Sequence, residues 1–255
     1  MSLYHDRVGR GPKLVLLHGW GMNAAVWGPL LPSLSAHFQV TLIELPGHGD
    51  SPPAAAADLS EWAAACLAVA PPNAHWLGWS LGGQIALRAA RLAPARVNRL
   101  SLIAATPRFV QGDDWPCAMP AATFEQFAAA LGDDPNATLA RFLGLQVRGA
   151  EHARETLRLL RAELAQRRPA SAAGLVQGLE LLLRNDLRAE LQQLSCPSHW
   201  LFGARDTLVP AALHPRLSEA LPQARIETIP GAGHAPFLSH PDACLDALLG
   251  CLSAA

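Results

Sequence analysis

The chain has 255 residues, a length at which one α/β domain with an inserted subdomain is common. Of these residues 50% are hydrophobic and 16% are charged, which allows a sizeable core and excludes an intrinsically disordered chain. The formal net charge is −1, from 20 basic and 21 acidic residues, so bulk electrostatics give no reason to expect binding to nucleic acid or to an anionic membrane.

Cysteine usage and hydropathy indicate the compartment. The five cysteines have no CxxC spacing and no neighbouring histidine cluster, so the sequence predicts neither a metal site nor a disulfide framework. The apolar run Leu14–Leu17 is too short for a signal peptide, and no apolar stretch reaches the ~18 residues of a membrane span. We therefore expect a cytoplasmic monomer without a membrane partner.

Up to residue 107, short apolar runs bounded by Gly or Pro alternate with longer helical stretches. The expected strands are Leu14–Leu17, Gln39–Glu44, His75–Gly78 and Arg99–Ala104. The expected helices are Ala24–His37, Leu59–Val69 and Leu81–Ala93. Alternation of this kind predicts an α/β fold, in which a mostly parallel sheet carries helices on both faces.

Between about residues 109 and 188 the strand pattern disappears. Four helical stretches follow one another there, at Thr123–Leu131, Ala137–Gln146, Glu151–Arg167 and Ala172–Leu183. Strands resume at Ser198–Phe202 and Arg225–Ile229, and a last helix begins near Asp242. We therefore predict one core built from residues 1–108 and 189–255, into which residues 109–188 are inserted as a helical cap.

A nucleophile motif stands between a predicted strand and a predicted helix. Residues 78–82 read G-W-S-L-G and fit the pattern G-x-S-x-G, in which small residues permit a strained turn that exposes the serine hydroxyl. The helix that follows directs backbone N–H groups at developing negative charge. Ser80 is therefore the candidate nucleophile, and the alternative is a glycine-rich turn with an incidental serine.

A serine hydroxyl needs a base that takes its proton, and after such an elbow the acid and then the histidine follow along the chain. Asp206 follows the strand that ends at Phe202, and His234 follows the strand that ends at Ile229. Both lie in loops beyond carboxyl ends of strands, so we expect them near Ser80. An ordinary turn or helix-cap role for Asp206 stays open.

Other titratable residues fit the order less well. Two histidines precede the serine, and a third adjoins Pro241, where it is expected to cap or pack against the last helix: His18, His48 and His240. Asp113 and Asp114 stand at the start of the predicted cap, where hinge or cap-terminus roles are more typical.

The remaining requirement is an oxyanion hole. The run H-G-W-G at residues 18–21 follows the first predicted strand, where this arrangement supplies one N–H donor, and the residue after the nucleophile supplies the other. This assigns the backbone N–H groups of Trp20 and Leu81. Ser80 would attack an ester carbonyl while His234 moves the proton, so no metal or cofactor is required.

These motifs resemble the landmarks of the α/β-hydrolase superfamily, together with L-P-G-H-G at residues 45–49 and G-A-G-H-A-P-F at residues 231–237. A narrower resemblance is to the carboxylesterases of biotin synthesis, which hydrolyse the methyl ester of pimeloyl-acyl-carrier protein. Its matches are Leu17–Gly21, Trp76–Gly83, Asp114–Pro116, Arg141–Leu143, Leu145–Gln146, His234–Phe237 and Ser239–Pro241.

The resemblance implies roles for further residues. It carries the catalytic triad onto Ser80, Asp206 and His234. It implies substrate contacts at Trp20, Ser80, Leu81, Phe142, Leu143, Gly144, Leu145 and Gln146. It also implies an acyl-carrier protein partner that docks on Arg141, Arg154 and Arg158, although Ala137 stands where the family has a further arginine.

Plainer readings remain for these residues. The arginines could form a solvated helix face with local glutamate pairs, and Phe142 and Leu145 could be ordinary core positions of an amphipathic helix. Two other functions also stay open: a general esterase or another hydrolase with the same core, and a non-catalytic binding protein that kept the fold.

Overall fold

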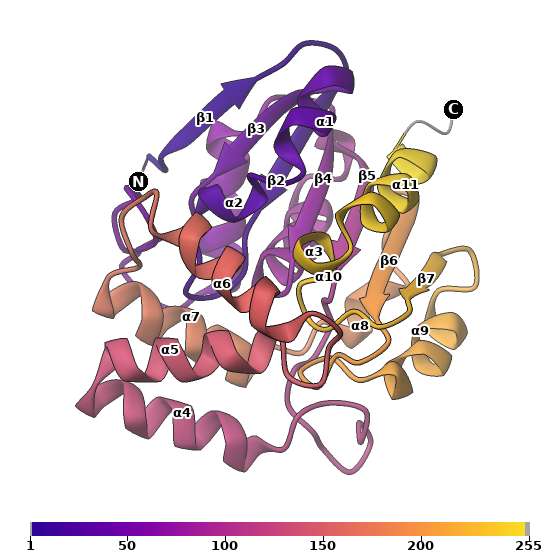
Figure 1. Cartoon of the computed structure of the whole chain (residues 1–255). Coiled ribbons are helices and arrows are strands. Elements are labelled where there is room, and N and C mark those ends of the chain that lie inside the picture. Colours follow the sequence, from indigo (N-terminus) through magenta and orange to yellow (C-terminus); the bar gives the residue numbers. More distant parts are fainter. Residues whose placement is uncertain (1, 253–255) are drawn as a thin grey trace.

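The computed structural model describes residues 2–252, and within them seven strands form one sheet in the order β1-β3-β2-β4-β5-β6-β7 (Figure 1). The antiparallel edge strand β1 pairs with β3, and every other pairing is parallel. The strands are β1 His5–Val8, β2 Lys13–Leu17, β3 Gln39–Ile43, β4 Ala74–Trp79, β5 Val97–Ile103, β6 Ser198–Gly203 and β7 Arg225–Ile229.

The predicted mostly parallel sheet is confirmed, and each of the six predicted strands is present within a few residues. The sequence analysis missed β1, whose four residues read H-D-R-V. They are half-buried or exposed, so they lack the apolar run that marked the inner strands.

Helices cover both faces of the sheet (Figure 1). Those of the first half are α1 Leu31–His37, α2 Leu59–Val69 and α3 Leu81–Leu92, and the last is α11 Pro241–Leu252. Helix α2 packs against α3, whereas α11 contacts β5, β6 and β7. The long helix predicted over residues 24–37 is wrong: a 3-10 turn, η1 Ala24–Trp27, precedes α1 because Gly28 and two prolines interrupt it.

The segment between β5 and β6 contains α4 Ala121–Asp133, α5 Pro135–Gln146, α6 Ala153–Leu164 and α7 Ala172–Arg184, which we call the insertion helices. They lie together at one end of the sheet (Figure 1). Helices α5 and α7 begin at side-chain caps, since Asp134 accepts from Ala137 N–H and Ser171 from Gly174 N–H. The predicted helix 151–167 begins later, after His152 with its positive φ of 56°.

The two ends of this segment meet. Leu187 N–H donates to Pro107 O at 2.9 Å. Beside this bond, Arg188 pairs with Asp186 at 2.7 Å and with Asp114 at 2.8 Å. The chain therefore leaves the sheet and returns to it at one place. The remaining short elements are η2 Pro94–Arg96, α8 Arg188–Leu191, η3 Ala211–Leu213, α9 His214–Ala220 and α10 Pro236–Ser239.

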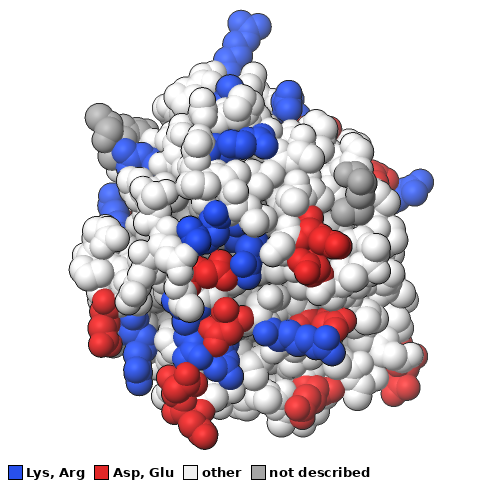
Figure 2. Space-filling view, turned by 180° about the vertical axis from the view of Figure 1, so that it is seen from behind, with Lys and Arg blue, Asp and Glu red and all other residues white. Residues whose placement is uncertain are grey.

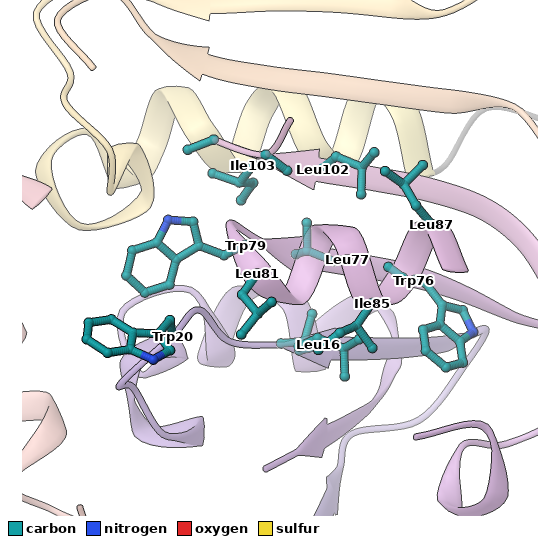
Figure 3. Packing of buried hydrophobic residues seen from close by; sticks show 14 of the residues in the cluster. Leu16, Trp20, Trp76, Leu77, Trp79, Leu81, Ile85, Leu87, Leu102 and Ile103 are labelled. Carbon is teal, nitrogen blue, oxygen red and sulfur yellow. The ribbon is translucent and has the colours of Figure 1, made fainter. Parts of the chain in front are cut away.

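One part of the core lies between the sheet and α3 (Figure 3). Leu16, Leu77 and Ile85 are fully buried in its middle, and each such side chain contributes about 1.5–3 kcal/mol of hydrophobic stabilisation. Trp20, Trp79 and Leu81 lie together at one end of the cluster (Figure 3). The residues around the predicted nucleophile are therefore continuous with the rigid core.

Charged side chains are distributed without a large area of one sign on the face shown in Figure 2, where acidic and basic residues lie side by side. Among the helices of residues 2–252, none is both long enough and apolar enough to cross a membrane.

Candidate active site

Ser80 occupies a strained turn between β4 and α3. Its φ of 55° and ψ of −117° are unusual for a residue with a side chain, and its N–H donates to Ile103 O at 3.0 Å. The flanking glycines are required by space: a Cβ at Gly78 would lie 2.4 Å from Gly82 O, and one at Gly82 would lie 2.4 Å from Leu17 O. This is the geometry of a nucleophile elbow.

A hydrogen-bonded chain links Ser80, His234 and Asp206. His234 Nε2 lies 3.0 Å from Ser80 Oγ, and His234 Nδ1 lies 2.7 Å from Asp206 Oδ2. All three residues are buried. Because the carboxylate accepts a hydrogen bond from Nδ1–H and so keeps that proton on Nδ1, Nε2 is left free to accept a proton from the serine.

Asp206 is itself fixed by its own loop. Its Oδ1 accepts hydrogen bonds from the N–H groups of Leu208 at 2.8 Å and Val209 at 3.0 Å. One carboxylate oxygen is therefore held by the backbone while the other faces the imidazole. Asp206 therefore has both roles that the sequence left open: it stabilises its own turn and it contacts His234.

The backbone of His234 is held from two sides. Its N–H donates to Gln146 O at the end of α5 at 2.9 Å, and its carbonyl accepts from Trp79 Nε1 at 2.8 Å. Sequence reasoning missed both partners. The Gln146 contact uses a main-chain atom and carries no residue signal, whereas Trp79 stands inside the G-x-S-x-G motif and could have been considered.

The backbone N–H groups assigned to an oxyanion hole are those of Trp20 and Leu81. Within residues 2–252, neither Trp20 N–H nor Leu81 N–H has an acceptor, so both are available to a ligand oxygen. Leu81 is the first residue of α3, where the helix dipole adds to the attraction for negative charge. The Trp20 side chain is anchored by a 2.8 Å hydrogen bond from Nε1 to Leu175 O.

Two buried histidines hold the loop that carries Trp20. His48 Nε2 accepts from Gly21 N–H at 3.1 Å, and its Nδ1 donates to Pro46 O at 2.9 Å. His18 Nε2 accepts from Leu45 N–H at 3.1 Å. Burial lowers the pKa of His18 to about 3 and that of His48 to about 4, so both rings are neutral near pH 7. Chain order set them apart from the predicted triad, but it gave no hint that they hold these loops.

A narrow cavity opens onto Ser80 and His234. Its other lining residues are apolar and come from α4, α5, α7 and two loops: Phe109, Met119, Phe124, Phe127, Phe142, Leu179, Leu182 and Leu208. Because no charged side chain other than the triad faces it, the cavity suits an uncharged acyl chain.

The predicted substrate residues are placed unequally. Phe142 lines the cavity and packs edge-to-face on Trp20 with ring centroids 4.6 Å apart. The other four described residues of that run, at positions 143–146, lie outside the cavity lining. Gln146 is buried, and within residues 2–252 its side-chain amide has no hydrogen-bond partner.

The three predicted docking arginines are exposed on the insertion helices. Arg141 lies over the Phe127 ring at 5.8 Å, and Arg154 and Arg158 project from α6. Within the described chain none of the three has a carboxylate partner at ion-pair distance. They therefore present positive charge that no neighbour neutralises.

The other candidates stand apart from the triad. Asp114 belongs to the ion pairs that join the two ends of the inserted segment. His240 accepts from Cys244 N–H through its carbonyl at the start of α11. In the described part of the chain, no group of three or more His, Cys, Asp or Glu side chains could hold a metal ion.

Comparisons with known proteins agree with this geometry. The sequence profile described as "alpha/beta hydrolase fold" matches residues 12–241. A protein of Xanthomonas oryzae pv. oryzae (strain MAFF 311018) is 48% identical over 250 residues, which cover 96% of this chain and 97% of the relative. A Stenotrophomonas maltophilia (strain K279a) protein is 45% identical over 246 residues, with coverages of 96% and 95%. Both are named pimeloyl-[acyl-carrier protein] methyl ester esterase.

Solved structures share the fold. An esterase from Exiguobacterium antarcticum superposes with a TM-score of 0.88 at 23% identity and covers 99% of this chain and 96% of its own. A hydrolase from Pseudomonas aeruginosa PA01 superposes with a TM-score of 0.82 at 28% identity, with coverages of 99% and 94%.

Proposed function

This chain belongs to the α/β-hydrolase fold family, and we propose that it is a carboxylesterase that hydrolyses the methyl ester of pimeloyl-acyl-carrier protein in biotin synthesis. The observation that carries the proposal is the 48% identity, over 96% of the chain, to a relative named for that activity. The hydrogen-bonded chain from Ser80 through His234 to Asp206 supports it, because ester hydrolysis needs this set of groups.

In the proposed reaction Ser80 Oγ attacks the ester carbonyl while His234 Nε2 takes its proton. The N–H groups of Trp20 and Leu81 stabilise the oxyanion, and each such donor is worth about 3–4 kcal/mol of barrier. His234 then returns the proton to the departing methanol. A water molecule activated by the same imidazole releases the free acid.

The cavity supports a choice of which ester is cleaved. The apolar lining suits a methylene chain, and a narrow cavity at Ser80 suits a small methyl ester better than a bulky group. A carrier protein would stay outside, attached through the other end of the chain. The choice of the methyl ester then follows from which end of the acyl chain can enter the cavity and contact Ser80. The chemical reactivity of the methyl ester and of the carrier-bound end does not decide it.

The insertion helices supply the outer part of this arrangement. We propose that residues 109–188 act as a cap over the core of residues 1–108 and 189–255. Arg141, Arg154 and Arg158 dock an acidic acyl-carrier protein, because they are exposed and unpaired. A monomer in the cytoplasm fits the five free cysteines, since thiols persist in reducing compartments.

The test is methanol release from methyl-pimeloyl-acyl-carrier protein by the wild-type chain and by Ser80→Ala. We expect fast release that the substitution lowers by at least about 10³-fold, because the nucleophile is lost. Free methyl esters run alongside separate the general short-chain carboxylesterase from the carrier-specific enzyme. Cleavage of free esters alone would discard the carrier, and Ser80-independent activity would discard the site.

A further inference from the structure

The connector between α5 and α6, residues 147–152, is joined to the loop that carries His234. At one end Gln146 O accepts the His234 N–H at 2.9 Å, and at the other Glu151 N–H donates to Gly231 O at 2.9 Å. The two backbones are in close contact, since a Cβ at Gly233 would lie 3.0 Å from Gln146 O. The position of the insertion helices and that of the histidine are therefore coupled.

Arg205 joins this connector to both triad loops. It directly precedes Asp206, and its N–H donates to Ala232 O at 2.8 Å, in the histidine loop. Its guanidinium reaches the connector, with Nη2 2.9 Å from Glu151 Oε1 and Nη1 3.4 Å from Gly149 O. One residue thus contacts the acid loop, the histidine loop and the connector.

We propose that Arg205 is a positioning residue: its side chain holds the connector against the histidine loop, so that His234 Nε2 stays within hydrogen-bonding reach of Ser80. The inference rests on the proposed esterase function, but it concerns the geometry of the base rather than the identity of the acyl group. A displaced His234 would slow proton transfer in the chemical step. Loss of the Arg205 side chain should therefore lower kcat and leave KM unchanged.

The size of the effect follows from exposure. The Arg205 and Glu151 side chains are 50% and 49% exposed, so water and salt screen their attraction. Removing the pair should lower kcat about two- to fivefold, the factor that corresponds to a half-exposed ion pair. Added salt should lower kcat of the wild type toward that of the variant and should leave the variant unchanged.

The experiment measures kcat and KM for p-nitrophenyl butyrate, a small ester that requires no carrier. The variants are Arg205→Ala, Glu151→Gln and the exchange Arg205→Glu with Glu151→Arg. We expect both single variants to lose kcat at unchanged KM, and the exchange to regain most of it. Arg184→Ala is the matched control, because its exposed ion pair with Glu180 lies on α7 away from the triad loops.

Two failures are distinguishable. If the wild type shows no Ser80-dependent hydrolysis, the proposed function fails. If the wild type is active but both single variants keep their kcat, change only KM, or are not rescued by the exchange, the role of Arg205 is overturned. Thermal unfolding of each variant separates a loss of folded protein from a loss of positioning.

Discussion

The sheet side and the insertion helices, which meet at Ser80, differ in where their polar groups lie. On the sheet side, His18, His48 and Asp206 are buried, and hydrogen bonds to backbone groups fix each of them. On the side of the insertion helices, the surface that faces the cavity is apolar, and the charged residues point outward. The comparison teaches that the backbone fixes the buried polar groups on the sheet side, whereas the insertion side presents apolar side chains to the cavity and carries its charges on the outer surface.

The largest expected effect is a loss of folding stability at acidic pH, caused by the buried histidines on the sheet side. Burial lowers the pKa of His18 to about 3 and of His48 to about 4, below their unfolded values. As pH falls from about 6.5 toward 4, these histidines become protonated in the unfolded chain but stay neutral in the folded chain. The free energy of unfolding therefore decreases as the pH is lowered. Each unit of pKa difference is worth about 1.4 kcal/mol, and the combined loss is on the order of several kcal/mol.

Urea unfolding at intervals from pH 8 to pH 4 measures this loss. His48→Gln should flatten the dependence on pH, because glutamine can still accept from Gly21 N–H but does not titrate. The exposed His37→Gln is the control and should follow the wild type. An identical slope for the wild type and His48→Gln would show that this ring does not contribute.

The next largest effect tests the apolar lining that the insertion helices contribute to the cavity. Phe127→Ala removes a buried ring from the cavity lining, and a buried Phe→Ala change costs about 3–5 kcal/mol of folding free energy. We expect kcat/KM to fall more for dimethyl pimelate than for methyl acetate, since only the longer chain reaches this ring. Gln126→Ala, an exposed neighbour on α4, should change neither value. Equal losses on both esters would remove Phe127 from the acyl channel.

The smallest effect concerns the outer surface of the same helices. Arg154→Ala and Arg158→Ala should each raise KM for the carrier-bound ester up to about fivefold, because exposed charge pairs contribute about 0.2–1 kcal/mol. The increase should shrink at high salt, and free esters should be unaffected. Arg184→Ala, already paired with Glu180, provides the comparison. A rise in KM for free esters would argue against docking.

The sequence predicted the parts of the molecule that local patterns specify. Short β-rich runs marked the strands β2 to β7, and G-x-S-x-G with chain order selected Ser80, Asp206 and His234, which the structure brings into hydrogen-bonding contact. Strand β1 escaped because its residues carry no apolar run. The helix predicted over residues 24–37 was overextended, because apolar periodicity continued across a Gly-Pro break.

Contacts between segments that are distant in the sequence could not be predicted from local patterns. Phe109, Leu182 and Leu208 line the cavity only because the insertion helices fold back over the sheet. Likewise, the bonds from Gln146 O and Trp79 Nε1 to His234 depend on tertiary placement, and the first uses an atom that every residue possesses. Side-chain identity alone cannot predict such partners.

The meeting of the two ends of the inserted segment has an evolutionary consequence. Pro107 and Leu187 are hydrogen-bonded, and Arg188 bridges Asp186 and Asp114 beside them. A segment that starts and stops at one point can change in length or sequence without altering strand register or the elbow. An exchanged segment would still have to supply the acceptor that Gln146 O provides to the His234 N–H.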